Sequence, residues 1–211
     1  MGKLIALIGN TGVGKTSLAQ ALAQTGEFNL GLEQHSTRPF QTLFKFDTRY
    51  AFANQVDYLL LRAEQERSIR QTALTGLIDG GLDQDFHGFT RLFHAKDMLN
   101  EPEYEVCRRL YSFIRSELPL PDLVIHMKAS KDAIRQRLSG RDRINIANVD
   151  DLDLLETYLN EWLASMSPDR ILSIDVSAAS RSYLELIPGL LSQIRGRFEQ
   201  EIDVYDTGYI P

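Results

Sequence analysis

A short stretch near the start of the chain combines glycine, lysine and hydroxyl side chains at a spacing that suits phosphate binding. Residues 9–16 read GNTGVGKT and match the pattern G-x-x-x-x-G-K-[ST], between an apolar run and a helix-like stretch. The glycines let backbone N–H groups turn toward phosphate oxygens, and the start of a helix adds partial positive charge. Lys15 can reach the β- and γ-phosphates of a nucleoside triphosphate, and the Thr16 hydroxyl can bind Mg²⁺. The predicted site for ATP consists of Gly9, Asn10, Thr11, Gly12, Val13, Gly14, Lys15, Thr16 and Ser17.

Apolar runs rich in β-forming residues predict the strands that position this stretch. Near-continuous apolar runs suit strands that are covered on both faces, as in parallel sheets, and helical patterns separate them. The alternation predicts one α/β domain over residues 1–211, with three layers and a mainly parallel five-stranded sheet flanked by helices. We also expect a bend at Pro188 and a loosely held tail at residues 203–211. The expected strands lie in residues 3–9, 28–34, 73–79, 121–129 and 170–176, and the expected helices in 17–24, 48–72, 102–118, 131–138, 152–166 and 180–200.

Composition narrows the class of protein. Apolar residues make up 43% and charged residues 25% of the chain, which is the usual mix of a soluble globular protein. The net charge of −6 argues against a nucleic-acid-binding surface, which needs clustered positive charge. Cys107 has no second cysteine to pair with, no apolar stretch reaches the length of a membrane span, and no leader-like segment precedes Leu4. We therefore expect a cytoplasmic protein that binds neither a nucleic acid polymer nor a membrane.

The phosphate-binding stretch identifies a phosphate donor but not an acceptor. The chain is short for a motor or switch NTPase and has no guanine-reading N-K-x-D sequence, so a small-molecule kinase is the simpler interpretation. Further along, Glu33 is followed by RYAFANQVDYLLLRAEQ, then LIDGGLDQD, then LPLPDLVIHMKASKDAIRQRLSGRDR. The order and spacing of these blocks resemble the deoxynucleoside kinase family, which includes deoxyadenosine, deoxyguanosine and deoxycytidine kinases. The resemblance runs from Leu4 to Arg143, and more loosely through YLNEWL at Tyr158, and implies a P-loop kinase fold.

The resemblance implies roles for residues on the acceptor side. Glu33 stands where the family has the carboxylate that accepts the 5′-hydroxyl proton. Gln55 stands where a glutamine contacts the base edge, and Arg62 where an arginine works with an aspartate, here Asp85. Because Gln55 and Arg62 are seven residues apart, they share one face of the predicted helix. Asp79 stands where an acidic residue holds Mg²⁺ through water, at the end of a strand, although an aspartate there can also cap a turn.

Three arginines within seven residues form the lid that the resemblance implies. Arg137, Arg141 and Arg143 lie in the segment 135–145, and such charges stabilise the transferring phosphoryl group. Arg137 and Arg141 are four residues apart and therefore project from the same side of a helix. A basic helix end is also favourable for the helix dipole alone. We expect a catalytic role for these arginines together with Glu33 and Lys15.

The chain departs from the family pattern at three positions. Gly80 replaces an arginine that normally contacts the 5′-hydroxyl and the catalytic carboxylate, and a glycine supplies neither charge nor donor. Phe44 replaces a tyrosine, and Ile146 lies where a glutamate is usual; those two residues normally hold the sugar 3′-hydroxyl. One hypothesis is that the segment before the long helix restores the missing charge. Its basic residues are Arg38, Lys45 and Arg49.

Three interpretations follow from these residues. The first is a Mg-ATP-dependent phosphotransferase acting on the 5′-hydroxyl of a deoxynucleoside or nucleoside with a purine or cytosine base, bound through Glu33, Phe44, Gln55, Arg62 and Asp85. The second is a nucleotide-binding protein with reduced or lost catalysis, which Gly80 supports. The third is a kinase for a nucleoside monophosphate or another small alcohol, which Arg38 and Arg49 keep open. The resemblance also implies a homodimer joined through helices.

Overall fold

A five-stranded parallel sheet forms the centre of the protein. A computed structural model describes residues 2–31, 38–139 and 149–206. The strands are β1 (Leu4–Gly9), β2 (Phe28–Gly31), β3 (Thr75–Asp79), β4 (Leu123–Lys128) and β5 (Ile171–Asp175). They follow the order β2-β3-β1-β4-β5, and every neighbouring pair is parallel. The five predicted strands are therefore confirmed, and the α/β P-loop kinase fold with them.

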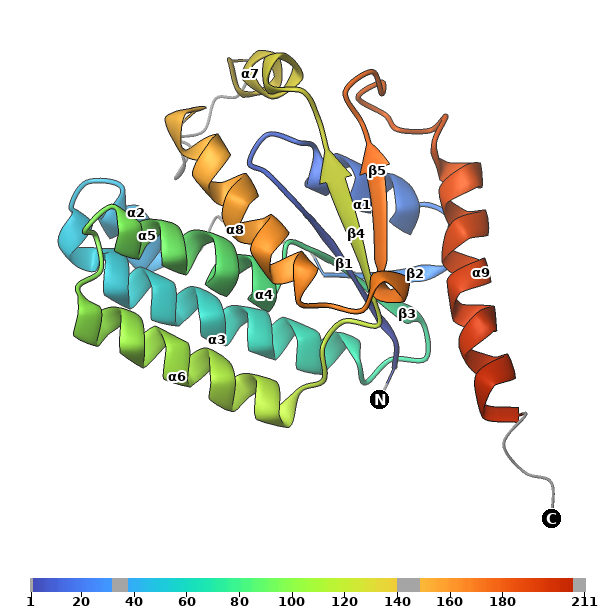
Figure 1. The fold of residues 1–211 in the computed structure, drawn as a ribbon, viewed down its shortest axis with the longest axis horizontal. Helices are drawn as coiled ribbons and strands as arrows, with labels where there is room; N and C mark the ends of the chain where they lie inside the picture. Colours follow the sequence, from blue (N-terminus) through green and yellow to red (C-terminus); the bar gives the residue numbers. More distant parts are fainter. Residues whose placement is uncertain (1, 32–37, 140–148, 207–211) are drawn as a thin grey trace.

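Alternate residues of the central strand pack against opposite layers of helices. Ile5 and Leu7 belong to an apolar cluster with residues of α1 (Lys15–Ala23) and α9 (Ile187–Asp206). Leu4, Ala6 and Ile8 belong to a second cluster, with residues of α3 (Ala51–Ile69) and α8 (Leu152–Ala164). Figure 1 shows α9 on one side of the sheet and α3, α6 (Glu101–Glu117) and α8 on the other. Burial on both faces explains the near-continuous apolar runs of the strands.

Local sequence accounts for where several helices begin. At the start of α6, the Asn100 side chain accepts from Glu103 N while the Glu103 side chain accepts from Asn100 N, which is a capping box. The prediction of a bend at Pro188 is wrong. Residues 181–186 form turns, and Pro188 lies in the first turn of α9, where its missing N–H costs no helix hydrogen bond. The helix continues to Asp206, so it includes the start of the predicted tail, whose residues 207–211 lie outside the described part.

The sequence patterns missed a run of helical turns between residues 82 and 95. It consists of α4 (Leu82–Gln84), the π-helical segment η3 (Asp85–Thr90) and α5 (Arg91–Ala95). In η3 the Asp85 carbonyl accepts hydrogen bonds from Thr90 Oγ1 at 3.0 Å and from Gln55 Nε2 at 3.1 Å. These side-chain donors satisfy a carbonyl in a segment whose wider turn departs from the usual helical hydrogen-bond pattern. The run places Asp85 beside α3.

Four shorter helical segments and α7 complete the described elements. They are α2 (Pro39–Phe44), η2 (Thr48–Tyr50), α7 (Lys131–Ser139), η4 (Val149–Asp151) and η5 (Pro168–Arg170). The helix predicted at residues 48–72 thus begins with the single turn η2 before α3. Among the helices of the described residues, none is both long enough and apolar enough to cross a membrane.

Candidate active site

The predicted phosphate-binding residues form the turn between β1 and α1. The turn approaches other elements so closely that some positions admit only glycine. Gly14, for example, has a φ of 104°, and a Cβ there would lie 1.9 Å from the hydroxyl oxygen of Tyr183. Tyr183 in turn donates to the Val13 carbonyl at 3.1 Å. The structure therefore gives the loop the strand–turn–helix context that phosphate binding requires.

Lys15 and Thr16, the first two residues of α1, lie where the sequence predicts them. Lys15 Nζ donates to the carbonyls of Gly9 at 2.8 Å and Asn10 at 3.1 Å, so the ammonium group lies over the loop. Thr16 Oγ1 donates to Asp79 Oδ2 at 2.5 Å. The two predicted magnesium ligands, 63 residues apart in the chain, are thus in direct contact at the carboxyl ends of β1 and β3.

Thr16 and Asp79 present oxygen atoms, the kind of ligand that Mg²⁺ prefers. No group of three or more His, Cys, Asp and Glu side chains that could hold a metal ion occurs within residues 2–31, 38–139 and 149–206. Mg²⁺ at phosphate sites is usually held by one or two protein oxygens, with phosphate oxygens and water completing the shell. A hydroxyl and a carboxylate beside a phosphate-binding loop fit that set.

On the acceptor side, the structure brings Gln55, Arg62 and Asp85 together. All three are buried, and Arg62 Nε donates to Asp85 Oδ2 at 2.6 Å. Gln55 Nε2 donates to the Asp85 backbone carbonyl at 3.1 Å. One of the two N–H groups of Gln55 is therefore used within the protein, and the other N–H and the amide oxygen remain for further hydrogen bonds. Glu33 lies outside the described residues.

Arg137 contacts the phosphate-binding loop through backbone carbonyls. It donates from Nη1 to Val13 O at 2.9 Å and from Nη2 to Val176 O at 2.6 Å. These bonds join α7 to the loop and to the residue after β5, so Arg137 holds the base of the predicted lid against the predicted phosphate-binding loop. Arg141 and Arg143 lie outside the described residues.

The positions that depart from the family pattern differ in their surroundings. Phe44 is buried in an apolar cluster, with its ring centroid 5.1 Å from that of Phe93, so most of its ring contacts the core. Ile146 lies outside the described residues. Gly80 and Gly81, with φ of 81° and 108°, form the turn that leads from β3 into α4. A Cβ at Gly80 would lie 3.3 Å from Arg62 Nη2.

In the segment proposed to compensate for Gly80, two basic residues are bound to carboxylates. Arg38 Nη1 binds Asp57 Oδ1 at 2.6 Å, and the mostly exposed Arg49 binds Asp47 at 2.7 Å. Lys45 is exposed. Two of the three basic residues are thus held by carboxylates of their own region.

Two contacts that join the loop to other elements were not predicted from the sequence. Gln84 of α4 accepts from Gly9 N at 3.1 Å, and Asn10 Nδ2 donates to Leu152 O at 2.9 Å, which joins the loop to α8. Asp83, Gln84 and Asp85 are three consecutive buried polar residues after a strand end. That run of polar residues is the one sequence feature that could have indicated polar partners in the interior.

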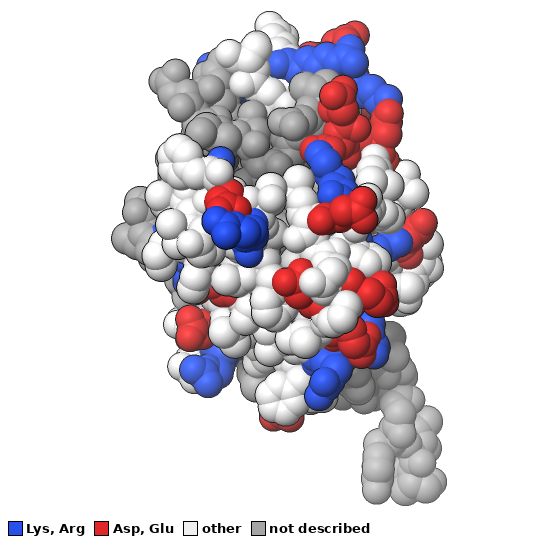
Figure 2. Space-filling view, turned by 90° about the vertical axis from the view of Figure 1, so that its left-hand side faces the viewer, with Lys and Arg blue, Asp and Glu red and all other residues white. Residues whose placement is uncertain are grey.

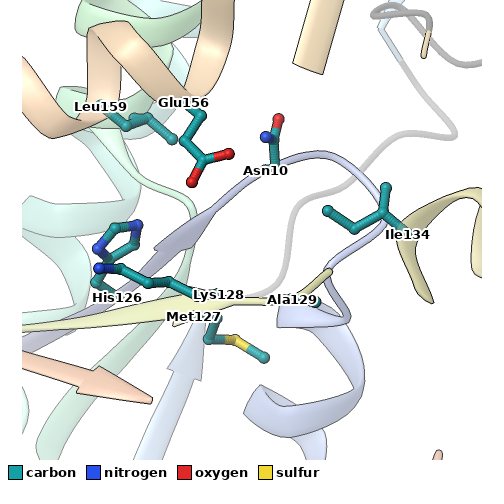
Figure 3. Close-up of a pocket in the computed structure, with 8 residues that line it drawn as sticks. All are labelled: Asn10, His126, Met127, Lys128, Ala129, Ile134, Glu156 and Leu159. Carbon is teal, nitrogen blue, oxygen red and sulfur yellow. The ribbon is translucent and has the colours of Figure 1, made fainter. Parts of the chain in front are cut away.

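A small cavity lined by both polar and apolar residues lies beside the loop, between β4, α7 and α8. Figure 3 shows Asn10, His126 and Glu156 directed toward it. Its volume of about 10 Å³ suits a single water molecule. Asn10 Oδ1 is buried and has no hydrogen-bond partner among the described residues, so a water here would satisfy it. Burial, with Lys128 nearby, lowers the pKa of His126 to about 4, so this imidazole is neutral at pH 7.

Comparison with known proteins agrees with this geometry. The sequence model of the deoxynucleoside kinase family matches residues 5–187. The chain is 27% identical to a deoxyadenosine kinase of Dictyostelium discoideum over 79% of its own length and 69% of that protein. It is 24% identical to a deoxyadenosine/deoxycytidine kinase of Bacillus subtilis, over 66% of each chain. A deoxyguanosine kinase of Bacillus subtilis is 26% identical, over 66% of this chain and 67% of the relative. With the family matched from β1 to the start of α9, the chain belongs to the deoxynucleoside kinases.

Proposed function

We propose that the protein transfers the γ-phosphoryl group of Mg-ATP to the 5′-hydroxyl of a deoxynucleoside whose base carries an exocyclic amino group. The contact between Thr16 and Asp79, beside the phosphate-binding loop, is the observation that carries this proposal. It supplies a hydroxyl and a carboxylate for Mg²⁺ at the sheet edge where ligands of α/β proteins bind. The same edge holds the buried group of Gln55, Arg62 and Asp85.

Each residue has a defined part in the proposed reaction. The loop amides and Lys15 bind the β- and γ-phosphates, and bound Mg²⁺ neutralises charge that develops on them. Glu33, as the resemblance implies, orients the acceptor hydroxyl and takes its proton. Arg137 keeps α7 against the loop, and Arg141 and Arg143 close over the transferring group.

Base preference follows from the hydrogen bonding of Gln55. With one N–H of Nε2 bound to Asp85 O, the Gln55 amide keeps its oxygen as an acceptor and one N–H as a donor for the base edge. An amide oxygen accepts from the amino group of adenine or cytosine, whereas thymine has no such group. The named relatives act on deoxyadenosine, deoxycytidine or deoxyguanosine, which supports a base of this kind.

A panel of substrates tests this function. Deoxyadenosine, deoxycytidine, deoxyguanosine and thymidine are each incubated with protein, ATP and Mg²⁺, and the monophosphate product is measured. A Lys15→Ala variant purified in parallel controls for contaminating kinases. We expect faster turnover of the amino-bearing substrates than of thymidine, and failure of all four would reject the proposal.

A second function, nucleotide binding without transfer, is favoured by one observation. Gly80 lacks the side chain that family members place beside the acceptor hydroxyl. Calorimetry that shows ATP binding, together with no product from any acceptor, would select this function. A nucleoside monophosphate kinase is less favoured, because Arg38 and Arg49 are paired with Asp57 and Asp47.

We also propose that the protein forms a homodimer through α3 and α6. These helices pack against each other and leave Leu60, Val106 and Phe113 exposed. Figure 2 views the molecule from the left-hand side of Figure 1 and shows charged side chains of both signs scattered over an otherwise uncharged face. Sedimentation equilibrium tests the proposal. A Phe113→Ser variant is expected to be monomeric, whereas Leu184→Ser, an exposed apolar position outside both helices, is expected to keep the wild-type mass.

A further inference from the structure

The turn after β3 leaves an open position beside a buried arginine. Gly80 follows Asp79 directly, and its φ of 81° lies in the left-handed region that side chains other than glycine rarely adopt. A Cβ built at this residue would lie 3.3 Å from Nη2 and 3.9 Å from Cζ of Arg62, and, the two adjoining residues aside, no other residue of the described part of the chain lies within 4 Å of it. The group that faces this position is therefore the Arg62 guanidinium.

Two hydrogen bonds fix the direction of that guanidinium. Nε donates to Asp85 Oδ2 at 2.6 Å, and Nη1 donates to Gln65 Oε1 at 3.1 Å. A guanidinium is planar and rigid, so fixing two of its nitrogens also fixes the third. Nη2 is thereby directed toward Gly80, and the side chain, which is 2% exposed, has little room to turn.

This nitrogen lies at the edge of the sheet where the proposed reaction takes place. Gly80 N donates to Leu7 O at 2.8 Å, which places the turn against the end of β1 just before the phosphate-binding loop. The neighbouring Asp79 contacts Thr16, the other proposed magnesium ligand. Ligands of α/β proteins collect outside the carboxyl ends of such strands.

Transfer of a phosphoryl group to an alcohol needs positive charge where the acceptor oxygen meets the phosphorus. In the basic segment before α3, Arg38 and Arg49 are held by Asp57 and Asp47. Among the residues that the structure describes, Arg62 is the cation that a side chain at Gly80 would meet.

We propose that Arg62 is a catalytic residue, and that its Nη2 donates a hydrogen bond to the acceptor hydroxyl oxygen as that oxygen approaches the γ-phosphoryl group. This inference rests on the proposed function and adds a role at the reacting atoms to the base-selecting role implied by the resemblance. The acceptor oxygen bonds to the γ-phosphorus while the bond from that phosphorus to the β–γ bridging oxygen breaks and ADP leaves. The hydroxyl proton passes to the general base, and Arg62 stays protonated throughout.

Three variants test the proposal through different atoms. Arg62→Lys removes the planar fork, Gly80→Ala pushes a methyl group toward Nη2, and Gln65→Ala, at a half-buried position, releases Nη1. We expect kcat to fall about 100-fold for Arg62→Lys and Gly80→Ala. For Gln65→Ala, which loses one orienting hydrogen bond, we expect a fall of about threefold to tenfold.

Matched controls separate catalysis from strain and stability. Gly81 has a φ of 108°, and a Cβ there would approach Ile78 and Glu66 but not Arg62, so Gly81→Ala brings strain without disturbing Arg62. Arg70→Lys alters a buried arginine directly after the last residue of α3, where it binds Asp122 and backbone carbonyls. Both controls are expected to keep the wild-type kcat while losing thermal stability.

The pattern across substrates distinguishes the two roles of Arg62. A role at the acceptor oxygen lowers kcat by the same factor for every deoxynucleoside that the wild type phosphorylates. A role in base selection alone raises KM by factors that depend on the base and leaves kcat unchanged, and this result would overturn the inference. If Arg62→Lys does not fold, Gly80→Ala and Gln65→Ala decide, and kcat values equal to that of Gly81→Ala reject the proposal. Failure of the wild type to transfer phosphate rejects the proposed function instead.

Discussion

Two arginines, the buried Arg62 of α3 and the half-buried Arg115 of α6, have surroundings that differ in a way that separates stability from chemistry. Arg115 of α6 binds Glu66 through both terminal nitrogens at 2.8 Å. It also binds Asp83 through Nε at 3.0 Å and Nη2 at 2.8 Å. We call Arg115, Glu66 and Asp83 the closed cluster, because two carboxylates enclose the guanidinium. Arg62, one helical turn before Glu66, has Asp85 on one side and the open position of Gly80 on another.

The comparison shows that two arginine–carboxylate groups, one on α3 and one between α3, α4 and α6, can serve different purposes. In the closed cluster, Tyr111 adds a further hydrogen bond to Asp83 at 2.8 Å, and burial together with the Asp83 charge raises the pKa of Tyr111. Every such contact joins α3, α4 and α6 to one another. Arg62 and Asp85 instead lie beside the turn that follows Asp79, at the carboxyl edge of the sheet. We therefore expect substitutions in the closed cluster to change stability and substitutions at the sheet edge to change turnover.

The largest effect on stability is expected for Arg115→Met. Removing the guanidinium leaves Glu66 and Asp83 buried without their cation, and breaking a buried ion pair in this way costs about 3–5 kcal/mol. Urea unfolding measures this loss, and kcat of the folded enzyme should not change. Arg108→Met, on the same helix but in an exposed pair with Glu105, should cost less than about 1 kcal/mol. If Arg115→Met lost no more unfolding free energy than Arg108→Met, the proposed stabilising role of the closed cluster would be wrong.

At the sheet edge the corresponding substitution is Asp79→Asn. The amide keeps a hydrogen-bond acceptor for Thr16 but removes the negative charge that we propose as a ligand of Mg²⁺. We expect kcat to fall about 100-fold and the Mg²⁺ concentration for half-maximal activity to rise, with little change in the free energy of unfolding. Asp175→Asn at the end of β5 is the matched control and should leave the Mg²⁺ titration unchanged. A similar titration for both variants would remove Asp79 from the metal site.

Each of the two regions also contains a histidine, the buried His126 and the half-buried His87, and both are expected to make stability depend on pH. Burial lowers the pKa of His126, near the loop, and of His87, beside Tyr111, from about 6.5 to about 4. Each folded imidazole binds fewer protons than the unfolded one, so its contribution is complete above pH 6.5 and is lost as the pH falls toward 4. Between pH 7 and pH 4.5 we expect a loss of about 2 kcal/mol for each histidine.

Urea unfolding of His126→Gln and His87→Gln at those two pH values checks this expectation. Each variant should flatten the pH dependence by a similar amount, since the physical cause is the same in both regions. A pH dependence equal to that of the wild type in either variant would show that the imidazole concerned is protonated without penalty in the folded protein.

The strands could be predicted from the sequence because burial on both faces gives each one a short apolar run. The order β2-β3-β1-β4-β5 could not, since no local pattern encodes which strands are neighbours. The helical run at residues 82–95 was missed because polar residues and Gly88 interrupt its apolar periodicity. The helical sequence pattern around Pro188 extends back through residues 181–186, although these residues form turns. The sequence therefore predicts a bend within a helix at the place where α9 begins.

In the candidate site, the spacing of the motif residues predicts which residues form the loop, but the sequence does not predict which distant residues contact them. The loop residues, and the approach of Arg62 to Asp85, follow from the motif and from the resemblance. The closed cluster joins Arg115 to partners 32 and 49 residues away, and Gln84 reaches Gly9 across 75 residues. Such contacts depend on how α4 and α6 are placed on the sheet, which a single sequence does not reveal.

The smallest effects are expected for two asparagines, one in each region. Asn10 Nδ2 joins the phosphate-binding loop to Leu152 O, and Asn100 caps α6, the helix that carries Arg115. Replacing either with alanine removes a comparable hydrogen bond and should cost about 1 kcal/mol in urea unfolding. Only Asn10→Ala should also raise KM for ATP, by about threefold, because the loop loses its tie to α8. Equal KM values in the two variants would mean that the loop keeps its shape without Asn10, and that Gln84 and Tyr183 are sufficient to hold it.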